Sequence, residues 1–224
     1  MNRCKSAFCV SLSGGVDSMV ISAILRHLHM EVTCVHVNYN NRLESEEEAE
    51  FLQRWAKEND ITFIYENILF AKRGEINRKV YEEKTRDIRF KCYKSVLEKS
   101  NATSIILGHH DDDIKENVVS NICQSRSLLE LSNMQVESMI HGVPISRQLL
   151  GCRKQNIYDF AFKYSIPFFK DTTPSWSVRG KLRNKVLPTL QDTYTSVDNN
   201  LLNIADQSNQ LNFIFINYVI DPFM

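Results

Sequence analysis

The sequence of 224 residues lacks several patterns that mark whole classes of protein. Its six cysteines form no C-x-x-C pair, which disfavours a zinc ribbon or a thioredoxin-type redox site. No apolar run reaches the roughly 18 to 20 residues that span a bilayer, so we expect no membrane helix. Residues 1–5 lead directly into a strand-like segment without a signal-peptide pattern. These absences predict a cytoplasmic protein with reduced thiols.

An excess of charge of either sign is also missing, because 27 Lys and Arg residues balance 27 Asp and Glu residues. A nucleic-acid partner would therefore have to contact a local basic patch, not a global positive field. Glycine and proline are scarce, at 7 and 5, and no low-complexity linker or internal repeat divides the chain. This length predicts one well-buried domain over residues 1–190 and a small helical tail over residues 191–224.

Short apolar runs alternate with helical patterns along most of the chain. Strands are expected at residues 7–12, 31–37, 61–65 and 104–107, and helices at 19–28, 43–59, 76–99, 112–123, 153–164, 181–190 and 201–219. Continuous apolar strands between helices indicate an α/β fold. We expect a parallel sheet of about five strands in a 3-2-1-4-5-like order, with helices on both faces and a C-terminal helical extension.

Two of these helices have an apolar face that can be named from the spacing of their residues. In the helix at 43–59 the face consists of Ala49, Leu52, Trp55 and Ala56. In the helix at 181–190 the predicted buried stripe consists of Leu182, Val186 and Leu190.

The most informative segment is Ser13-Gly14-Gly15-Val16-Asp17-Ser18, between the first strand and the first helix. Two glycines let the backbone turn tightly and point consecutive N–H groups at an anion. The seryl hydroxyls add donors, and the following helix directs the positive end of its dipole at the same point. A plain glycine turn is the alternative, but the strand–loop–helix context favours a phosphate-binding loop. The segment lacks the G-K-[ST] ending of the Walker loop, which disfavours γ-phosphate transfer.

A second polar segment, from Gly108 to Asn117, follows the fourth strand. On a helix, Asp112 and Asp113 lie four and three residues before Glu116, so their carboxylates can converge. Their simplest role is to stabilise the N-terminus of the helix. In the expected strand order, however, the loops after strands one and four border the same crevice. Asp17 and the group of Asp112, Asp113 and Glu116 could then share Mg²⁺, or some of these carboxylates could instead hold the ammonium of an amine substrate.

The glycine-rich hexapeptide resembles the S-G-G-x-D-S signature of the PP-loop ATP pyrophosphatases. Further segments narrow the resemblance to the tRNA(Ile)-lysidine synthetase family. Residues 36–45 are similar to its H-V-[ND]-H-G-L-R-x-E-S stretch, 86–90 to R-x-x-R-[YF], 109–117 to H-H-x-D-D-x-x-E-T, 147–150 to R-P-L-L, and 171–188 to D-P-[ST]-N…R-N-x-[IL]-R…L-P. The matches follow the family order and cover most of the chain.

This resemblance implies an ATP-dependent ligase. It would transfer AMP to the C2 oxygen of cytidine at the wobble position of a tRNA(Ile), release pyrophosphate, and join free lysine to form lysidine. The implied ATP-binding residues are Ser13, Gly14, Gly15, Val16, Asp17, Ser18, His36 and His109. The implied catalytic residues are Asp17, Asp112, Asp113, Glu116, Arg86 and Arg89, with Mg²⁺ on Asp17 and Asp113. The implied tRNA contacts are Arg42, Arg147, Arg179 and Arg183.

The sequence also departs from the family pattern. Gln124–Ser127 occupy the place of an R-G-x-G stretch, and Gly180 replaces an asparagine. The chain ends at Met224, where family members usually continue into C-terminal tRNA-binding domains. We therefore expect either a different substrate, or a homodimer or partner subunit that supplies those contacts. Two alternatives stay open. One is another PP-loop tRNA modifier such as a thiolase, disfavoured by the lack of cysteine pairs; the other is a catalytically inactive ATP- and RNA-binding subunit.

Overall fold

The structure is a computed structural model that describes residues 7–40, 43–69, 77–132, 134–171, 173–220 and 223. The chain divides into two compact units, which are described separately. The first, called the sheet unit, comprises Met1–Gly108, Glu137–Gln148 and Ile157–Lys170. The second, called the helical unit, comprises His109–Val136, Leu149–Asn156 and Asp171–Met224.

The sheet unit contains the whole six-stranded sheet, in the order β3-β2-β1-β4-β6-β5. Its strands are β1 (Ala7–Ser11), β2 (Glu31–Asn38), β3 (Thr62–Asn67), β4 (Ile105–Ile106), β5 (Glu137–Ile140) and β6 (Val143–Ser146). Neighbouring strands are parallel except β5 and β6, which pair antiparallel. The predicted α/β fold and its 3-2-1-4 strand order are confirmed.

The β5–β6 hairpin was not predicted from the sequence, and it adds an antiparallel edge strand to the sheet. Each of its strands has only four residues, and the second contains Pro144. Such short runs show too little alternation to identify a strand, and proline is tolerated mainly at sheet edges and bulges.

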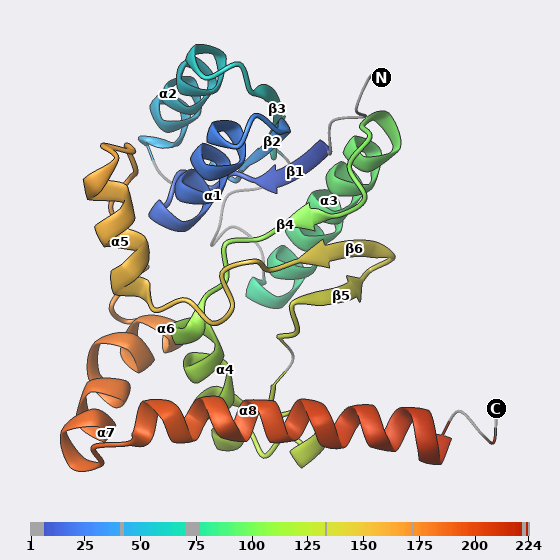
Figure 1. Cartoon of the computed structure of the whole chain (residues 1–224), viewed down its shortest axis with the longest axis vertical. Helices are drawn as coiled ribbons and strands as arrows, with labels where there is room; N and C mark the ends of the chain where they lie inside the picture. The colour runs from blue at the N-terminus through green and yellow to red at the C-terminus, as the bar shows by residue number, and fades with distance from the viewer. Residues whose placement is uncertain are drawn as a thin grey trace. The chain divides into compact units, whose positions relative to one another are not determined.

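Helices cover both faces of this sheet. α1 (Val16–His27) connects β1 to β2, and α2 (Ser45–Glu58) connects β2 to β3. α3 (Arg78–Lys99) then crosses to β4, on the other side of β1. Because such crossovers are right-handed, the reversal of direction places α3 on the face opposite α1 and α2. Figure 1 shows α1 and α2 together, and α3 beside β4 and β6.

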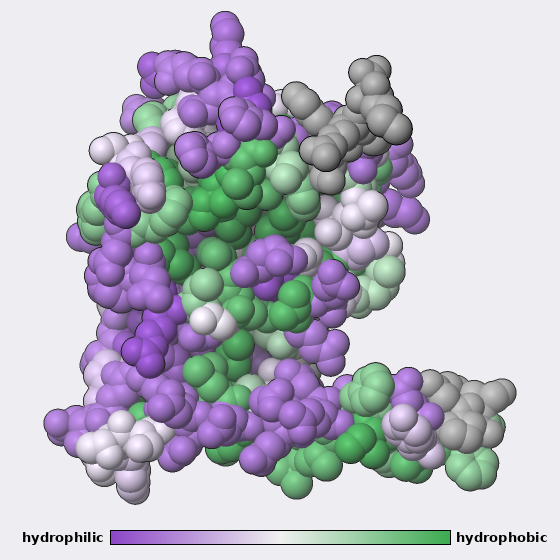
Figure 2. All heavy atoms as spheres, in the orientation of Figure 1, coloured by the Kyte–Doolittle hydropathy of each residue, from purple (hydrophilic) through white to green (hydrophobic). Residues whose placement is uncertain are grey.

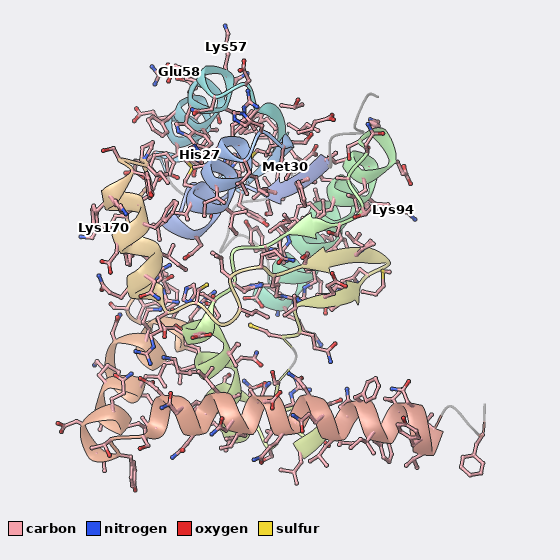
Figure 3. All side chains as sticks on the ribbon, in the orientation of Figure 1. His27, Met30, Lys57, Glu58, Lys94 and Lys170 are labelled. Carbon is pink, nitrogen blue, oxygen red and sulfur yellow. The ribbon has the colours of Figure 1, made fainter. Side chains whose placement is uncertain are left out.

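One core cluster of the sheet unit lies between α3 and the sheet. Its buried residues come from α3, the central strands and the hairpin: Cys9, Val35, Phe90, Tyr93, Val96, Ala102, Ile105, Val143 and Ile145. Burying each large apolar side chain of this kind stabilises a fold by about 1.5–3 kcal/mol. Lys94 instead projects outward from α3 (Figure 3), so only one side of this helix packs on the sheet.

The predicted apolar face of α2 is confirmed. Ala49, Leu52, Trp55 and Ala56 are all buried, with at most 8% of each residue exposed. The remaining surface of α2 is hydrophilic in Figure 2, and Lys57 points away from the unit in Figure 3. The amphipathic pattern therefore determined how this helix is oriented on the sheet.

The helical unit is built around α4 (Asp111–Cys123) and α8 (Val197–Ile214). Its other elements are η1 (Leu128–Glu130), α6 (Val178–Lys181), η2 (Leu182–Val186), α7 (Leu187–Thr193) and η3 (Phe215–Ile220), while α5 (Lys154–Lys163) runs from this unit into the sheet unit. Its core consists of Val118, Val119, Leu182, Leu187, Leu201 and Ala205. The predicted C-terminal helical extension is confirmed as α8.

The predicted helix at 181–190 differs from the structure in its register. Between α6 and α7 the chain forms a π-helical turn at η2. A π turn contains more residues than an α turn, so the side chains that follow are displaced around the helix axis. Leu187 is consequently buried at 6% exposure, whereas Val186 is 38% exposed. Placing Val186 in the buried stripe was wrong.

The last turns of the C-terminal helix carry exposed apolar side chains, seen as green spheres in Figure 2. They include Phe213, Ile214 and Ile216, which are 41–60% exposed. Among the described residues, however, there is no helix of sufficient length and hydropathy to cross a membrane.

Candidate active site

The predicted phosphate loop joins β1 to α1 in the sheet unit. Gly14 has φ +82°, in the left-handed region that favours glycine, whereas Gly15 has φ −70° and ψ 159°. Gly15 is the N-cap of α1, and it has no side chain that could bond the first N–H groups of the helix. Those groups lack intrahelical partners, so they and the dipole of α1 favour an anion at this position.

Two serines shape the same loop from within. The Oγ atom of Ser18 accepts the N–H of Ser13 at 3.2 Å and donates to the carbonyl of Gly15 at 3.1 Å. The Oγ atom of Ser13 accepts the N–H of Gly15 at 3.3 Å. These hydrogen bonds hold the loop in its turn through its own seryl hydroxyls.

Phe169, which is distant in sequence from the loop, contacts the loop at Gly14. Its N–H donates to the carbonyl of Gly14 at 2.9 Å, and its ring packs edge-on against Phe51, with 5.4 Å between the ring centroids. A Cβ atom on Gly14 would lie 2.4 Å from the Phe169 ring. The glycine is therefore required both for its backbone conformation and for this close contact. The sequence contains no signal for Phe169, because nothing in its local pattern refers to the loop.

The loop also lies at the end of the neighbouring strand, β4. A Cβ atom on Gly108 would come within 2.8 Å of the Cβ atom of Asp17. Strands one and four are adjacent, as predicted, and the chain leaves β4 directly against the first turn of α1. Asp17 is the acidic residue of that turn.

His36, a predicted nucleotide contact, supports the residue that precedes the loop. Its Nδ1 atom lies 2.7 Å from the carbonyl oxygen of Leu12, and the ring stacks near Phe63 and Tyr65. A carbonyl only accepts, so Nδ1 carries the proton and Nε2 is an acceptor in the neutral ring. Burial lowers the pKa of His36, which favours this neutral form.

The two predicted catalytic arginines of α3 differ in their surroundings. Arg86 is exposed, whereas Arg89 is half-buried and donates from Nη1 to the hydroxyl of Tyr39 at 3.4 Å. The Nε atom of Arg89 is buried and has no hydrogen-bond partner among the described residues. An unsatisfied donor of this kind is costly unless a ligand or water accepts from it.

In the helical unit, the acidic segment begins α4 with a capping box. The Nδ1 atom of His110 accepts the N–H of Asp112 at 3.2 Å, and the Asp113 carboxylate accepts the N–H of His110 at 3.1 Å. Nδ1 is thus an acceptor, which leaves the ring proton on Nε2, 3.4 Å from Asp113. Burial alone would raise the pKa of Asp113, but His110 and Arg179 hold it below its ordinary value.

Asp113 and Glu116 converge on two arginines of the following helices. Arg179 bonds to Asp113 through Nη2 and to Glu116 through Nε, the latter at 2.9 Å. Arg183 donates from Nε to Glu116 at 2.7 Å and from Nη1 to Asp171 at 2.5 Å. Asp113 and Glu116 are each no more than 5% exposed, so their charges require such partners.

Asp112 takes a different partner. Its carboxylate lies 2.5 Å from the Nζ atom of Lys115, which is also 3.2 Å from Asp198 of α8. Burial would lower the pKa of Lys115, but the two carboxylates raise it. Asp112 therefore belongs to a different ionic network from Asp113 and Glu116.

The structure also accounts for the glycine at position 180. Its N–H donates to the Oγ atom of Ser177, the N-cap of α6. A Cβ atom there would lie 2.2 Å from the carbonyl oxygen of Pro174. Asparagine, which the resemblance leads one to expect, would not fit this turn without a shift of the backbone.

The remaining predicted residues are placed as follows. Arg147 is buried and donates to Ser138 of the hairpin at 2.9 Å. His109 is half-buried at the start of the helical unit. Arg42 lies outside the described residues.

The expected Mg²⁺ is compatible with the types of side chain present, because it prefers oxygen ligands. Within the described ranges, no three His, Cys, Asp or Glu side chains gather into a metal site. Mg²⁺ at Asp17 or Asp113 would therefore need water and phosphate oxygens to complete its coordination, as is common for this ion. Burial raises the pKa of the Cys9 and Cys34 thiols to about 12, so neither is a ready nucleophile.

Comparison with known proteins places these features in a family. Residues 1–190 match the PP-loop domain. A bifunctional protein TilS/HprT from Listeria innocua serovar 6a is 25% identical over 93% of this chain and 33% of its own length. The tRNA(Ile)-lysidine synthase of Chlamydia caviae is 26% identical over 98% of this chain and 69% of its own length. That of Chlamydia felis is 28% identical over 92% of this chain and 65% of its own length. The chain thus spans from a third to about two thirds of these relatives.

Solved structures agree on the fold. The U34-tRNA thiolase NcsA from Methanococcus maripaludis superposes with a TM-score of 0.71 and 16% identity, over 94% of this chain and 74% of that one. The NMN synthetase of Francisella tularensis gives a TM-score of 0.54 and 13% identity, over 100% and 92%. The resemblance to lysidine synthetases drawn from the motifs is confirmed by the relatives, and the match over residues 1–190 shows that the chain belongs to the PP-loop domain family.

Proposed function

We propose that this chain is an ATP-dependent ligase that forms lysidine on a tRNA. The observation that carries the proposal is the phosphate loop at the start of α1, in a chain whose relatives include tRNA(Ile)-lysidine synthases. Those relatives are longer than this chain, so substrate and activity are inferences for it.

In the first step, the C2 oxygen of cytidine attacks the α-phosphorus of ATP, and pyrophosphate leaves. The N–H groups and hydroxyls of Ser13–Ser18 bind the phosphates, and the dipole of α1 offsets their charge. Asp17 would hold Mg²⁺, and the ion would neutralise charge on the leaving pyrophosphate. The free Nε–H of Arg89 is a donor for an oxygen of the substrate.

In the second step, the ε-amine of lysine attacks C2 of the cytidine and displaces AMP. The amine must lose a proton in this step, and a carboxylate is needed to position it. Glu116 and Asp113 are buried anions suited to an ammonium group, provided that Arg179 and Arg183 yield one of their bonds. Released arginines would be available to tRNA phosphates, as would Arg42.

The test incubates purified protein with ATP, radiolabelled lysine and tRNA, and measures tRNA-bound lysine and pyrophosphate. Label in tRNA supports the proposal. Pyrophosphate without label would favour a different nucleophile, such as the sulfur donor of a thiolase. ATP binding with neither product would indicate an inactive subunit.

A pair of variants then tests the role of the buried carboxylates. Glu116→Gln should reduce lysine incorporation by about tenfold or more, because hydrogen bonds to charged groups are worth about 1.5–3 kcal/mol. Asp192→Asn removes an exposed carboxylate of the same unit and should leave incorporation unchanged. Equal activity of the two variants would remove Glu116 from the mechanism.

A further inference from the structure

The segment from Gln124 to Ser132 follows α4 and presents polar side chains to solvent. Gln124, Ser125, Arg126 and Ser127 are all exposed. Arginine, serine and glutamine are side chains that commonly bond to nucleic-acid phosphates and sugars. This segment, called the 124–132 loop, is therefore suited to contact RNA, provided that its backbone is held in place.

Asn121 holds the loop from the side of α4. Its side chain is buried, at 7% exposure, and its Nδ2 atom donates to the carbonyls of Glu130 at 3.2 Å and Leu131 at 3.1 Å. The same nitrogen lies 3.0 Å from Oδ1 of Asn117. The amide thus satisfies carbonyl groups that no regular secondary structure would satisfy.

Ser208 holds the loop from the side of α8. It is 2% exposed, its Oγ atom donates to the carbonyl of Leu128 at 2.8 Å, and it accepts the N–H of Ser132 at 3.4 Å. The next residue, Asn209, lies within 3.5 Å of the Ser132 hydroxyl. A buried hydroxyl is stable only with such partners, so this serine and the loop backbone depend on each other.

The position of Ser208 in the sequence gives these bonds their significance. The PP-loop match ends at residue 190, and α8 begins at Val197. Ser208, which lies outside the matched region, therefore holds the backbone of a loop that lies inside it.

We propose that Ser208 and Asn121 are positioning residues for an RNA-contacting 124–132 loop, which makes α8 part of the RNA-binding apparatus. This inference rests on the proposed function, because it assumes that tRNA is the substrate. Arg126 is the cation of the loop that contacts the RNA backbone, and Ser208 acts through it.

The experiment is a double-mutant cycle with Arg126→Ala, Ser208→Ala and the double variant. RNA affinity is measured by fluorescence anisotropy over a range of salt concentrations, and the KM for tRNA by lysine incorporation. Arg126→Ala should weaken RNA binding by about tenfold and reduce the salt slope by about one. Ser208→Ala should raise the KM for tRNA several-fold with kcat nearly unchanged, and should add little to Arg126→Ala.

A control separates positioning from general destabilisation of α8. Ala205→Gly weakens the same helix by about 1 kcal/mol but leaves the Ser208 hydroxyl in place. It should not change the KM for tRNA. The inference is overturned if Ser208→Ala behaves like Ala205→Gly, or if its effect is undiminished in the Arg126→Ala background. A wild-type chain that binds RNA without incorporating lysine would refute the proposed function alone, and anisotropy would still test the loop.

Discussion

The two glycines of the phosphate loop, which look equivalent in sequence, should respond very differently to alanine. In Gly14→Ala the new Cβ atom would lie 2.4 Å from the Phe169 ring, at a residue with φ +82°. The left-handed conformation costs a non-glycine residue about 1–2 kcal/mol. Overpacking adds about 1–3 kcal/mol. The loss of unfolded-state entropy offsets about 0.4–1 kcal/mol.

The expected loss is therefore about 3 kcal/mol of unfolding free energy for Gly14→Ala. Gly15→Ala is the matched control, because its φ of −70° suits alanine and the nearest atom, Ser13 Oγ, is 3.4 Å away. It should be as stable as wild type or more stable by up to about 1 kcal/mol. Urea denaturation followed by circular dichroism measures both. Equal stabilities of the two variants would refute the roles assigned to Phe169 and to the backbone of Gly14.

Three further outcomes are expected. Asp17→Asn should abolish pyrophosphate release. It should lower the unfolding free energy by no more than about 1 kcal/mol, because an acid in the first turn of a helix contributes about that much. Retained turnover in the pyrophosphate assay would contradict the role of Asp17. Ser125→Gly should raise the unfolding free energy, measured by urea denaturation, by about 0.5–1 kcal/mol. Ser125 has φ +55°, and the backbone strain that glycine relieves is larger than the entropy that glycine adds to the unfolded chain. A less stable variant would argue against this strain. Because burial lowers the pKa of His36, the unfolded chain binds a proton first, so stability should fall as pH drops below about 6.5. His36→Gln should flatten that part of the curve, and an equally steep pH dependence would exclude this explanation.

Local patterns predicted the regular elements of the fold well. The strands with continuous apolar residues and the apolar face of α2 were correct because burial on a sheet or helix imposes a simple period on the sequence. The β5–β6 hairpin was missed because four-residue strands carry almost no period. Val186 was misplaced because a π turn changes the register without a sequence signal.

The sequence by itself determined the turn between β1 and α1, because two adjacent glycines between a strand and a helix favour a tight turn that leads into the first N–H groups of the helix. Only the tertiary structure decided which groups support that loop and which neutralise the acids. Phe169 behind Gly14, and Arg179 and Arg183 on Glu116, come from distant parts of the chain. Such contacts depend on the tertiary packing of elements that are distant in the sequence, and the local spacing of residues in a single sequence does not predict that packing.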